Sequence, residues 1–244
     1  MSSRHASSRP VTSWLVTGAS RGIGFELVRQ LLASPENLVV AACRNPTTAT
    51  ALRHLQEHAR GTLHIIHMDV SDFDSVRASA KSLEPILGEV GLDYLINNAG
   101  IATRDTSFTL DPDELLRIVR TNVAGPALVS QTCLPFLQKG KRKVILNISS
   151  TAGSLATVED IGGRHTSYAI SKAALNMLTL KQKAERPDII TVTLCPGWVK
   201  TDMGGEEAYV DTEESISKIL AIIASVTATD SGKFVRYTGE TIPW

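Results

Sequence analysis

A tyrosine and a lysine four residues apart are the side chains best suited to chemistry. The run Ser167-Tyr-Ala-Ile-Ser-Lys-Ala-Ala-Leu-Asn-Met-Leu178 is rich in helix formers, which predicts a helix from about Ser167 to Glu185. Residues four apart share one face of a helix, so the Lys172 ammonium is expected beside the Tyr168 phenol. At about 4.5 Å and an effective dielectric of about 20, this cation favours the phenolate by roughly 3.7 kcal/mol. We therefore expect Lys172 to lower the pKa of Tyr168 and make it a general acid or base. Taken alone, the spacing also fits a solvated surface lysine.

Composition narrows the classes of protein. The 244 residues are 43% hydrophobic and 20% charged, with a formal net charge of zero. No basic stripe is present, which argues against nucleic acid or an anionic membrane as a partner. Cys43, Cys133 and Cys195 stand in apolar segments without metal-ligand spacing, so we expect buried thiols in a reducing, cytoplasmic setting. No metal site is expected, because the histidines form no ligand set: His54, His58, His64, His67 and His165.

Short apolar runs alternate with helical patterns along the chain. The expected strands are 14–17, 38–43, 63–66, 94–97, 144–148 and 189–194, and the expected helices 22–33, 47–59, 73–88, 112–138, 167–185 and 212–225. This rhythm predicts an α/β protein: a single-domain Rossmann fold with a doubly wound parallel sheet of about seven strands and helices on both faces. Pro85 and Pro126 fall inside expected helices, so a kink or break is expected there.

The domain organisation follows from the same pattern. Residues 12–244 are expected to form one catalytic domain, because no linker divides them. Residues 1–11 are expected to be a flexible tail. The first ten, rich in Ser, Arg and His, fit either such a tail or a weak organellar presequence.

The turn after the first strand has the composition of a phosphate cradle. Glycines stand at 18, 22 and 24 in Thr17-Gly-Ala-Ser-Arg-Gly-Ile-Gly24, directly before a helix. Gly18 permits the tight turn, Gly22 lets a pyrophosphate approach the backbone, and Gly24 lets the helix pack closely. The N–H groups of the helix N-terminus would then face the phosphates.

Cofactor choice is expected at the end of the second strand. NAD-binding proteins usually place an acid there for the ribose 2′-hydroxyl, but this strand ends Ala42-Cys-Arg-Asn45. Arg44 is placed to meet a 2′-phosphate, and Arg21 could reach it from the glycine turn. Each arginine alone fits a solvated surface charge. Together with the missing acid they favour NADP(H).

The joint pattern resembles the short-chain dehydrogenase/reductase family over roughly residues 12 to 244. The matching motifs are the glycine turn, Asn97-Asn-Ala-Gly100, Asn122, Ser150, Tyr168-x-x-x-Lys172 and Pro196-Gly197. The run Pro196–Gly205 and the ending Gly239-Glu-Thr-Ile-Pro-Trp are similar to the branch of sniffer-type carbonyl reductases, C-factor-like proteins and norsolorinic acid ketoreductases. This resemblance implies a Rossmann fold and NAD(P)-dependent carbonyl/alcohol chemistry.

The resemblance implies four catalytic residues. Tyr168 and Lys172 are the central pair, and Ser150 resembles the serine that holds the substrate oxygen. Ser154 is a rival, because the gap from Ser150 to Tyr168 is longer than usual. Asn122 resembles the asparagine that holds a water in a proton relay. It also fits a buried polar residue paired with backbone.

The remaining family positions are expected to contact the cofactor. With Tyr168 and Lys172 they are Gly18, Ser20, Arg21, Gly22, Ile23, Gly24, Arg44, Asp69, Val70, Asn98, Ala99, Gly100, Arg120, Pro196, Gly197, Val199 and Thr201.

The expected function is transfer of hydride between NADP(H) and a carbonyl or alcohol. Apolar residues near the expected mouth favour a neutral aromatic or aliphatic carbonyl as substrate: Ile101, Leu155, Trp198 and Met203. The resemblance to norsolorinic acid ketoreductases implies that the substrate could belong to fungal secondary metabolism. Two alternatives stay open. One is a redox-sensing regulator that binds NADP(H) without turnover, and the other is a sugar-nucleotide epimerase or dehydratase, for which the C-terminal part is short. Self-association into a homo-oligomer also stays open.

Overall fold

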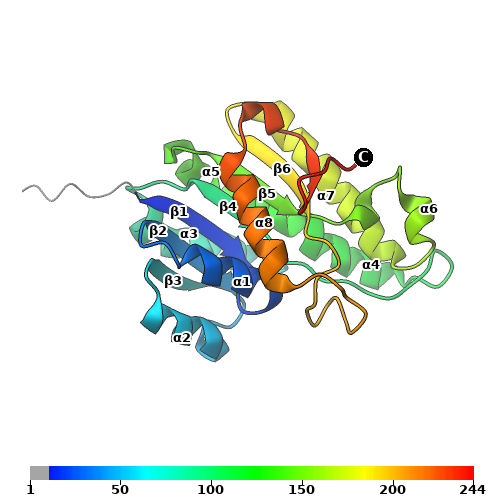
Figure 1. Ribbon diagram of the computed structural model, residues 1–244, viewed down its shortest axis with the longest axis horizontal. Coiled ribbons are helices and arrows are strands. Elements are labelled where there is room, and N and C mark those ends of the chain that lie inside the picture. The colour runs from blue at the N-terminus through cyan, green and yellow to red at the C-terminus, as the bar shows by residue number, and fades with distance from the viewer. Residues whose placement is uncertain (1–10) are drawn as a thin grey trace, which may run out of the picture.

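The computed structural model describes residues 11–244, apart from the side chains of residues 160 and 161. The expected tail therefore lies almost entirely outside the described residues. Figure 1 shows a single sheet between two layers of helices. Its seven strands are all parallel, in the order β3-β2-β1-β4-β5-β6-β7. The strands are β1 (Thr12–Thr17), β2 (Asn37–Cys43), β3 (Thr62–His67), β4 (Tyr94–Asn97), β5 (Val144–Ile148), β6 (Ile190–Cys195) and β7 (Phe234–Arg236).

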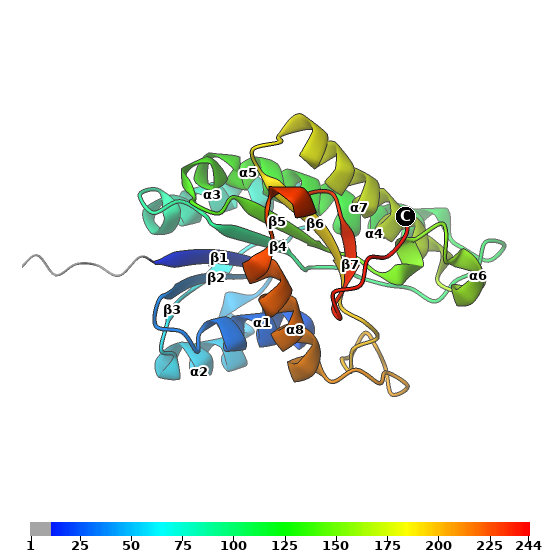
Figure 2. The same ribbon diagram turned by 45° about the horizontal axis from the view of Figure 1, so that its top comes forward.

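Helices cover both faces of the sheet, which confirms the doubly wound prediction (Figure 2). On one face lie α1 (Gly22–Leu31), α2 (Thr50–His58) and α8 (Thr212–Ser225), packed through Leu27, Leu52 and Ile219. The other face carries α3 (Phe73–Leu87), α4 (Pro112–Val119), α5 (Gly125–Lys139) and α7 (Thr166–Glu185). A short helix, α6 (Val158–Ile161), precedes α7. None of the helices among residues 11–244 is long and apolar enough to cross a membrane.

The expected helix 112–138 is interrupted where its proline predicts a break. Residues Arg120–Ala124 form a π-turn between α4 and α5, and Pro126 lies in the first turn of α5. Proline has no N–H, so the carbonyl of Asn122 loses its α-helical donor four residues on. Pro85 causes no break, because it lies in the last turn of α3.

The C-terminal segment folds back over the last strand. Val235 of β7 forms an antiparallel bridge with Thr241, and the Trp244 ring stacks on Phe234 at 5.3 Å between centroids. The Ser154 hydroxyl donates to the carbonyl of Pro243 at 2.6 Å. The chain end is thus tied to the loop after β5.

The central strands place the expected functional residues at one edge of the sheet. The chain passes from β3 on one side of β1 to β4 on its other side, so the strand order reverses there. In open α/β sheets, ligands bind outside the carboxyl ends of the strands at such a point. The glycine turn follows β1, residues 98–100 follow β4, and Ser150 follows β5.

Candidate active site

Helix α7 brings Tyr168 and Lys172 together on its inner face. The Lys172 side chain is 5% exposed and its Nζ lies 5.5 Å from the centroid of the Tyr168 ring. The ammonium donates to the carbonyl of Ile148 at 2.8 Å, where β5 ends. The Tyr168 residue as a whole is partly buried.

Burial dominates the ionisation of both groups. It raises the pKa of Tyr168 above its ordinary value; the negative charge of an ionised Cys195 would add to the rise, and the Ser150 hydroxyl opposes it. Burial also lowers the pKa of Lys172 to about 8. The expectation that the pKa of Tyr168 lies below its ordinary value is therefore wrong for the protein alone. Desolvation of the phenol is the largest cause of the rise, and the Lys172 ammonium faces the tyrosine ring and a backbone carbonyl.

Three serines near the end of β5 occupy different environments. The Ser150 hydroxyl lies close enough to Tyr168 to oppose the rise in its pKa, and it accepts from the amide of Ala152 at 3.2 Å. Ser149 points to the opposite side and donates to Asn176 Oδ1 at 2.7 Å. Ser154 is 2% exposed and donates to the C-terminal segment. Of Ser150 and its rival Ser154, the structure brings Ser150 to the tyrosine.

The side chain of Asn122 is fully buried and links three segments. Its Oδ1 accepts from the amide of Ile101 at 2.9 Å, and its Nδ2 donates to the carbonyl of Ile101 at 2.8 Å. Nδ2 also donates to Ser171 Oγ of α7 at 3.0 Å. The amide is thus occupied by protein partners. The group left without its helical donor is the Asn122 backbone carbonyl, because of Pro126.

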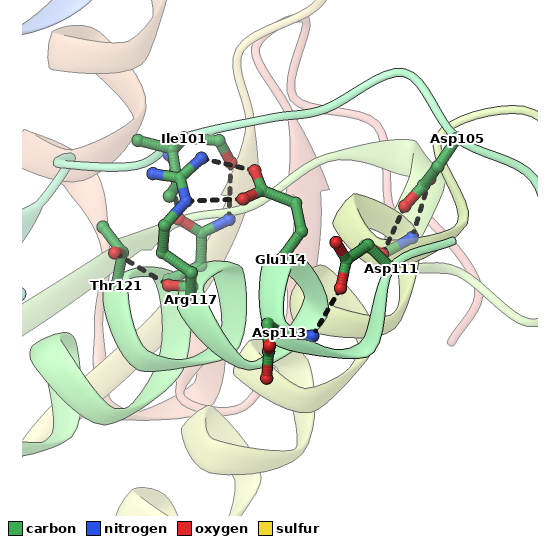
Figure 3. Close-up of polar contacts among 9 residues, drawn as sticks. Ile101, Asp105, Asp111, Asp113, Glu114, Arg117 and Thr121 are labelled. Carbon is green, nitrogen blue, oxygen red and sulfur yellow. Dashed lines mark hydrogen bonds and ion pairs between the residues drawn. The ribbon is translucent and has the colours of Figure 1, made fainter. Parts of the chain in front are cut away.

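Asp105 holds the first turn of α7 and was not anticipated from the sequence. One carboxylate oxygen accepts from the Ser167 amide at 3.1 Å and the other from the Ser167 hydroxyl. Figure 3 shows Asp105 reaching this helix from the loop that begins at Ile101. No local signal predicts the contact, because the two residues are 62 positions apart.

The glycine turn has the geometry expected of a phosphate cradle. Gly18 and Gly22 have φ of 65° and 54°, in the left-handed region that favours glycine. A Cβ on Gly24 would lie 2.3 Å from the Gly18 carbonyl oxygen and 2.6 Å from Asn98 Nδ2. The turn is fixed to β4, because Asn98 Nδ2 donates to the carbonyl of Thr17 at 2.8 Å. Ser20 and Ile23 lie within this turn.

A cavity of about 230 Å³ opens between the glycine turn and the end of β2. Arg21 and Arg44 line it together with six polar or small residues: Ser20, Asn45, Thr48, Ala49, Thr50 and Ala51. Arg21 Nη1 also pairs with Asp202 at 3.1 Å, with both side chains largely exposed. Such an exposed pair is weak, so Arg21 is free to exchange partners. No acidic side chain lines this cavity.

The other expected cofactor residues fall around the same edge of the sheet. Thr201 stands against the glycine turn, with its methyl 3.4 Å from a Cβ placed on Gly22. A Cβ placed on Gly100 would lie 3.7 Å from Lys172 Nζ. Arg120 packs its guanidinium 4.0 Å from the Phe73 ring centroid and donates to the Ser71 carbonyl, so protein contacts already account for its position. The remaining expected cofactor residues lie in the segments that follow β3, β4 and β6: Asp69, Val70, Ala99, Pro196, Gly197 and Val199.

Two of the five histidines lie beside a glutamate in an arrangement that could hold a metal ion, so the expectation that the histidines form no ligand set stays a prediction. His54, Glu57 and His58 lie on one exposed turn of α2, with one ligand atom of each within 4.8 Å of the others. The spacing i, i+3, i+4 carries this signal, because such residues share a helix face. His64, His67 and His165 lie outside this cluster.

The fold is of the Rossmann type, with the Tyr168–Lys172 pair beside a glycine turn at the carboxyl ends of its central strands. The family model for short chain dehydrogenases matches residues 13–210. An NADPH-bound carbonyl reductase from chicken fatty liver is 39% identical with a TM-score of 0.90, covering 97% of this chain and 100% of that one. The carbonyl reductase Sniffer of D. melanogaster is 34% identical with a TM-score of 0.90, covering 96% and 100%. C-signal of Myxococcus xanthus is 37% identical over 156 residues, which are 63% of this chain and 93% of that protein. The chain belongs to the short-chain dehydrogenase family.

Proposed function

We propose that this oxidoreductase reduces carbonyl compounds with NADPH. The observation that carries the proposal is the convergence of Ser150, Tyr168 and buried Lys172 at one edge of the sheet, beside the glycine turn. Residues 12–244 would act as one catalytic domain. The three free, buried cysteines support a reducing compartment such as the cytoplasm.

Tyr168 is proposed as the general acid. Its raised pKa keeps the phenol protonated at neutral pH, so a proton is available to the substrate oxygen. Ser150 lies beside the same phenol and would donate to that oxygen as well. As negative charge develops on the oxygen, these two donors stabilise it. Burial of Lys172 puts a cation next to the phenolate that forms, where it reduces the cost of losing the proton.

The proton of Tyr168 must be replaced after each turnover. The Asn122 carbonyl, without its α-helical donor, is proposed to bind a water on the route from Lys172 to solvent. The Asn122 side chain holds this part of the backbone through Ile101 and Ser171.

The cradle suits NADP(H), which supplies hydride to the carbonyl carbon when bound. Gly18, Gly22 and the N-terminus of α1 would hold the pyrophosphate. Arg44 and Arg21 would meet the 2′-phosphate in the cavity of about 230 Å³. The NADPH-bound relative from chicken liver supports this choice.

A neutral aromatic or aliphatic carbonyl is the proposed substrate class. Leu155, Trp198 and Met203 are 78%, 46% and 56% exposed, so they offer apolar surface that a substrate would cover. Trp198 is held in place, because its Nε1 donates to the Gly204 carbonyl at 2.8 Å. Aromatic ketones of the kind processed in fungal polyketide pathways belong to this class.

A screen that pairs NADPH with neutral ketones, aldehydes, acyl-CoA compounds and 2-keto acids tests the proposal. We expect NADPH consumption and an alcohol product, identified by mass spectrometry, with the neutral set. Preference for the anionic set would contradict the substrate class. Cofactor binding without any product would favour the redox-sensing regulator, and conversion of a sugar nucleotide without net NADPH consumption would favour the epimerase.

A further inference from the structure

The exposed turn of α2 offers three metal-ligand groups away from the proposed active site. His54, Glu57 and His58 place one ligand atom each within 4.8 Å of one another, and the two imidazole centroids are 4.5 Å apart. All three side chains are exposed, so small rotations can bring their ligand atoms to one ion.

The neighbouring backbone selects the ligand atom of His58. Its Nδ1 lies 2.9 Å from the carbonyl oxygen of His54. A carbonyl can only accept, so in the neutral ring Nδ1 carries the proton and Nε2 keeps its lone pair. Metal-binding histidines are commonly oriented in this way by a hydrogen bond from the other ring nitrogen.

We propose that His54, Glu57 and His58 form a binding site for a divalent transition metal such as Zn²⁺ or Ni²⁺. Two imidazoles and one carboxylate suit these borderline ions, whereas Mg²⁺ prefers oxygen ligands. The ion would tie together the side chains of one turn of a helix in which Leu52 is the one buried residue. Binding at this turn would therefore stiffen α2.

Calorimetric titration of the full-length chain, free of any affinity tag, with Zn²⁺ and with Ni²⁺ tests this site. We expect one saturable site in the wild type and an affinity at least tenfold lower in His54→Ala and in His58→Ala. Glu57→Gln should weaken binding less. His5→Ala and His67→Ala serve as controls and should bind as the wild type does. Absence of saturable binding, binding by His54→Ala equal to wild type, or equally tight binding of Mg²⁺ would overturn the proposal.

A separate observation concerns the segment 101–107, which crosses from Asn122 to the first turn of α7. At one end Asn122 holds both backbone groups of Ile101. At the other, Asp105 accepts from Ser167, and His165 Nδ1 lies 2.8 Å from the carbonyl of Thr103.

Helix α7 lacks a cap of its own. Its N-cap residue, His165, has φ of 58° and makes no side-chain cap hydrogen bond. The free N–H groups of the first turn need an acceptor, and the helix dipole favours an anion there. The Asp105 carboxylate meets both needs one residue before Tyr168.

We infer that Asp105 is a positioning residue for Tyr168, an inference that rests on the proposed function. Its carboxylate fixes Ser167, which is fully buried, and so sets the direction in which the next side chain leaves the helix. Asp111 provides a matched comparison in the same loop, since it caps the adjacent helix α4 through the Asp113 amide at 2.9 Å (Figure 3).

Two readouts separate this inference from the proposed function. In Asp105→Ala, hydrogen exchange at the Ser167 amide should accelerate on the order of tenfold, whether or not the enzyme turns over. The kcat for carbonyl reduction should fall by a similar factor with NADPH affinity unchanged, and Asp105→Asn, which keeps one acceptor, should recover most of it. Asp111→Ala should leave both unchanged. Unaltered hydrogen exchange in Asp105→Ala, or an equal loss of kcat in Asp111→Ala, would overturn the inference. A wild-type protein that reduces none of the carbonyl compounds would count against the proposed function alone.

Discussion

At the scale of single residues, burial of Lys172 has a measurable thermodynamic consequence. Its pKa falls from 10.5 to about 8 on folding, so between these values the unfolded chain binds more protons. The free energy of unfolding therefore rises with pH between these two values. Below pH 8 the native protein carries the full cost of burying the ammonium. Replacing the lysine removes that cost. The stability difference between Lys172→Met and wild type should accordingly shrink by about 3 kcal/mol as pH rises from 8 to 10.5.

Urea denaturation of both proteins at pH 7 and pH 10 measures this difference. Lys81→Met, which removes an exposed lysine, is the matched control and should show little change with pH. A pH-independent difference for Lys172→Met would mean that Lys172 is not desolvated in the native state.

Arg44 should decide cofactor preference. A charge-assisted hydrogen bond to a 2′-phosphate contributes about 1.5–3 kcal/mol, or roughly 10- to 150-fold in affinity. Arg44→Asp is expected to lose this factor for NADPH and to gain affinity for NADH, since a carboxylate can accept from the ribose hydroxyl. Fluorescence titration with both cofactors gives the ratio, with exposed Arg53→Asp as a control for the charge change. Equal binding of NADH and NADPH by the wild type would contradict the prediction.

Spacing along the chain predicts some of these residues and not others. Tyr168 and Lys172 follow from helical periodicity, and the structure places them as expected. The sequence favoured Ser150 over Ser154, because Asn147-Ile-Ser-Ser-x-x-Gly153 fits the family motif, but the long gap to Tyr168 kept Ser154 as a rival. The pKa of Tyr168 was predicted in the wrong direction, because desolvation depends on packing that spacing does not reveal.

At the scale of elements, the β1–α1 turn depends on the absence of a side chain at Gly24. A Cβ there would lie 2.3 Å from the Gly18 carbonyl oxygen, so Gly24→Ala must displace the turn. We expect a loss of about 1–3 kcal/mol in unfolding free energy and a large loss of NADPH affinity. Gly163→Ala, where a Cβ meets nothing within 4 Å, is the control. Wild-type NADPH affinity in Gly24→Ala would refute this role for the turn.

The elements themselves were largely predictable from sequence. Buried apolar runs gave six of the seven strands, and Pro126 indicated the break between α4 and α5. Strand β7 is three residues long, too short for a periodic signal. The contact between Asp105 and α7 depends on tertiary structure, so no local pattern could predict it.

At the scale of the whole molecule, a buried carboxylate joins three parts of the sheet edge opposite the site. Asp93 is 4% exposed and accepts from the amides of Ser13, Lys141 and Arg142 at 3.0, 2.7 and 3.0 Å. Removing it leaves these donors without an acceptor, so Asp93→Ala should lose about 3 kcal/mol or more of unfolding free energy. Asp74→Ala, which removes an exposed carboxylate, should change it by less than about 1 kcal/mol. Similar values for the two variants in chemical denaturation would contradict this account of the fold.

The central claim is that Tyr168 gives its proton to the substrate oxygen. The most direct test is the rate of NADPH oxidation in a single turnover, with a carbonyl substrate from the screen, for wild type and Tyr168→Phe. The variant keeps the ring and loses only the hydroxyl, so NADPH affinity measured in parallel should fall by far less than the rate. We expect the rate to fall by about 10²- to 10⁴-fold, the usual contribution of a general acid. A Tyr168→Phe protein that reduces the substrate as fast as wild type would contradict the claim.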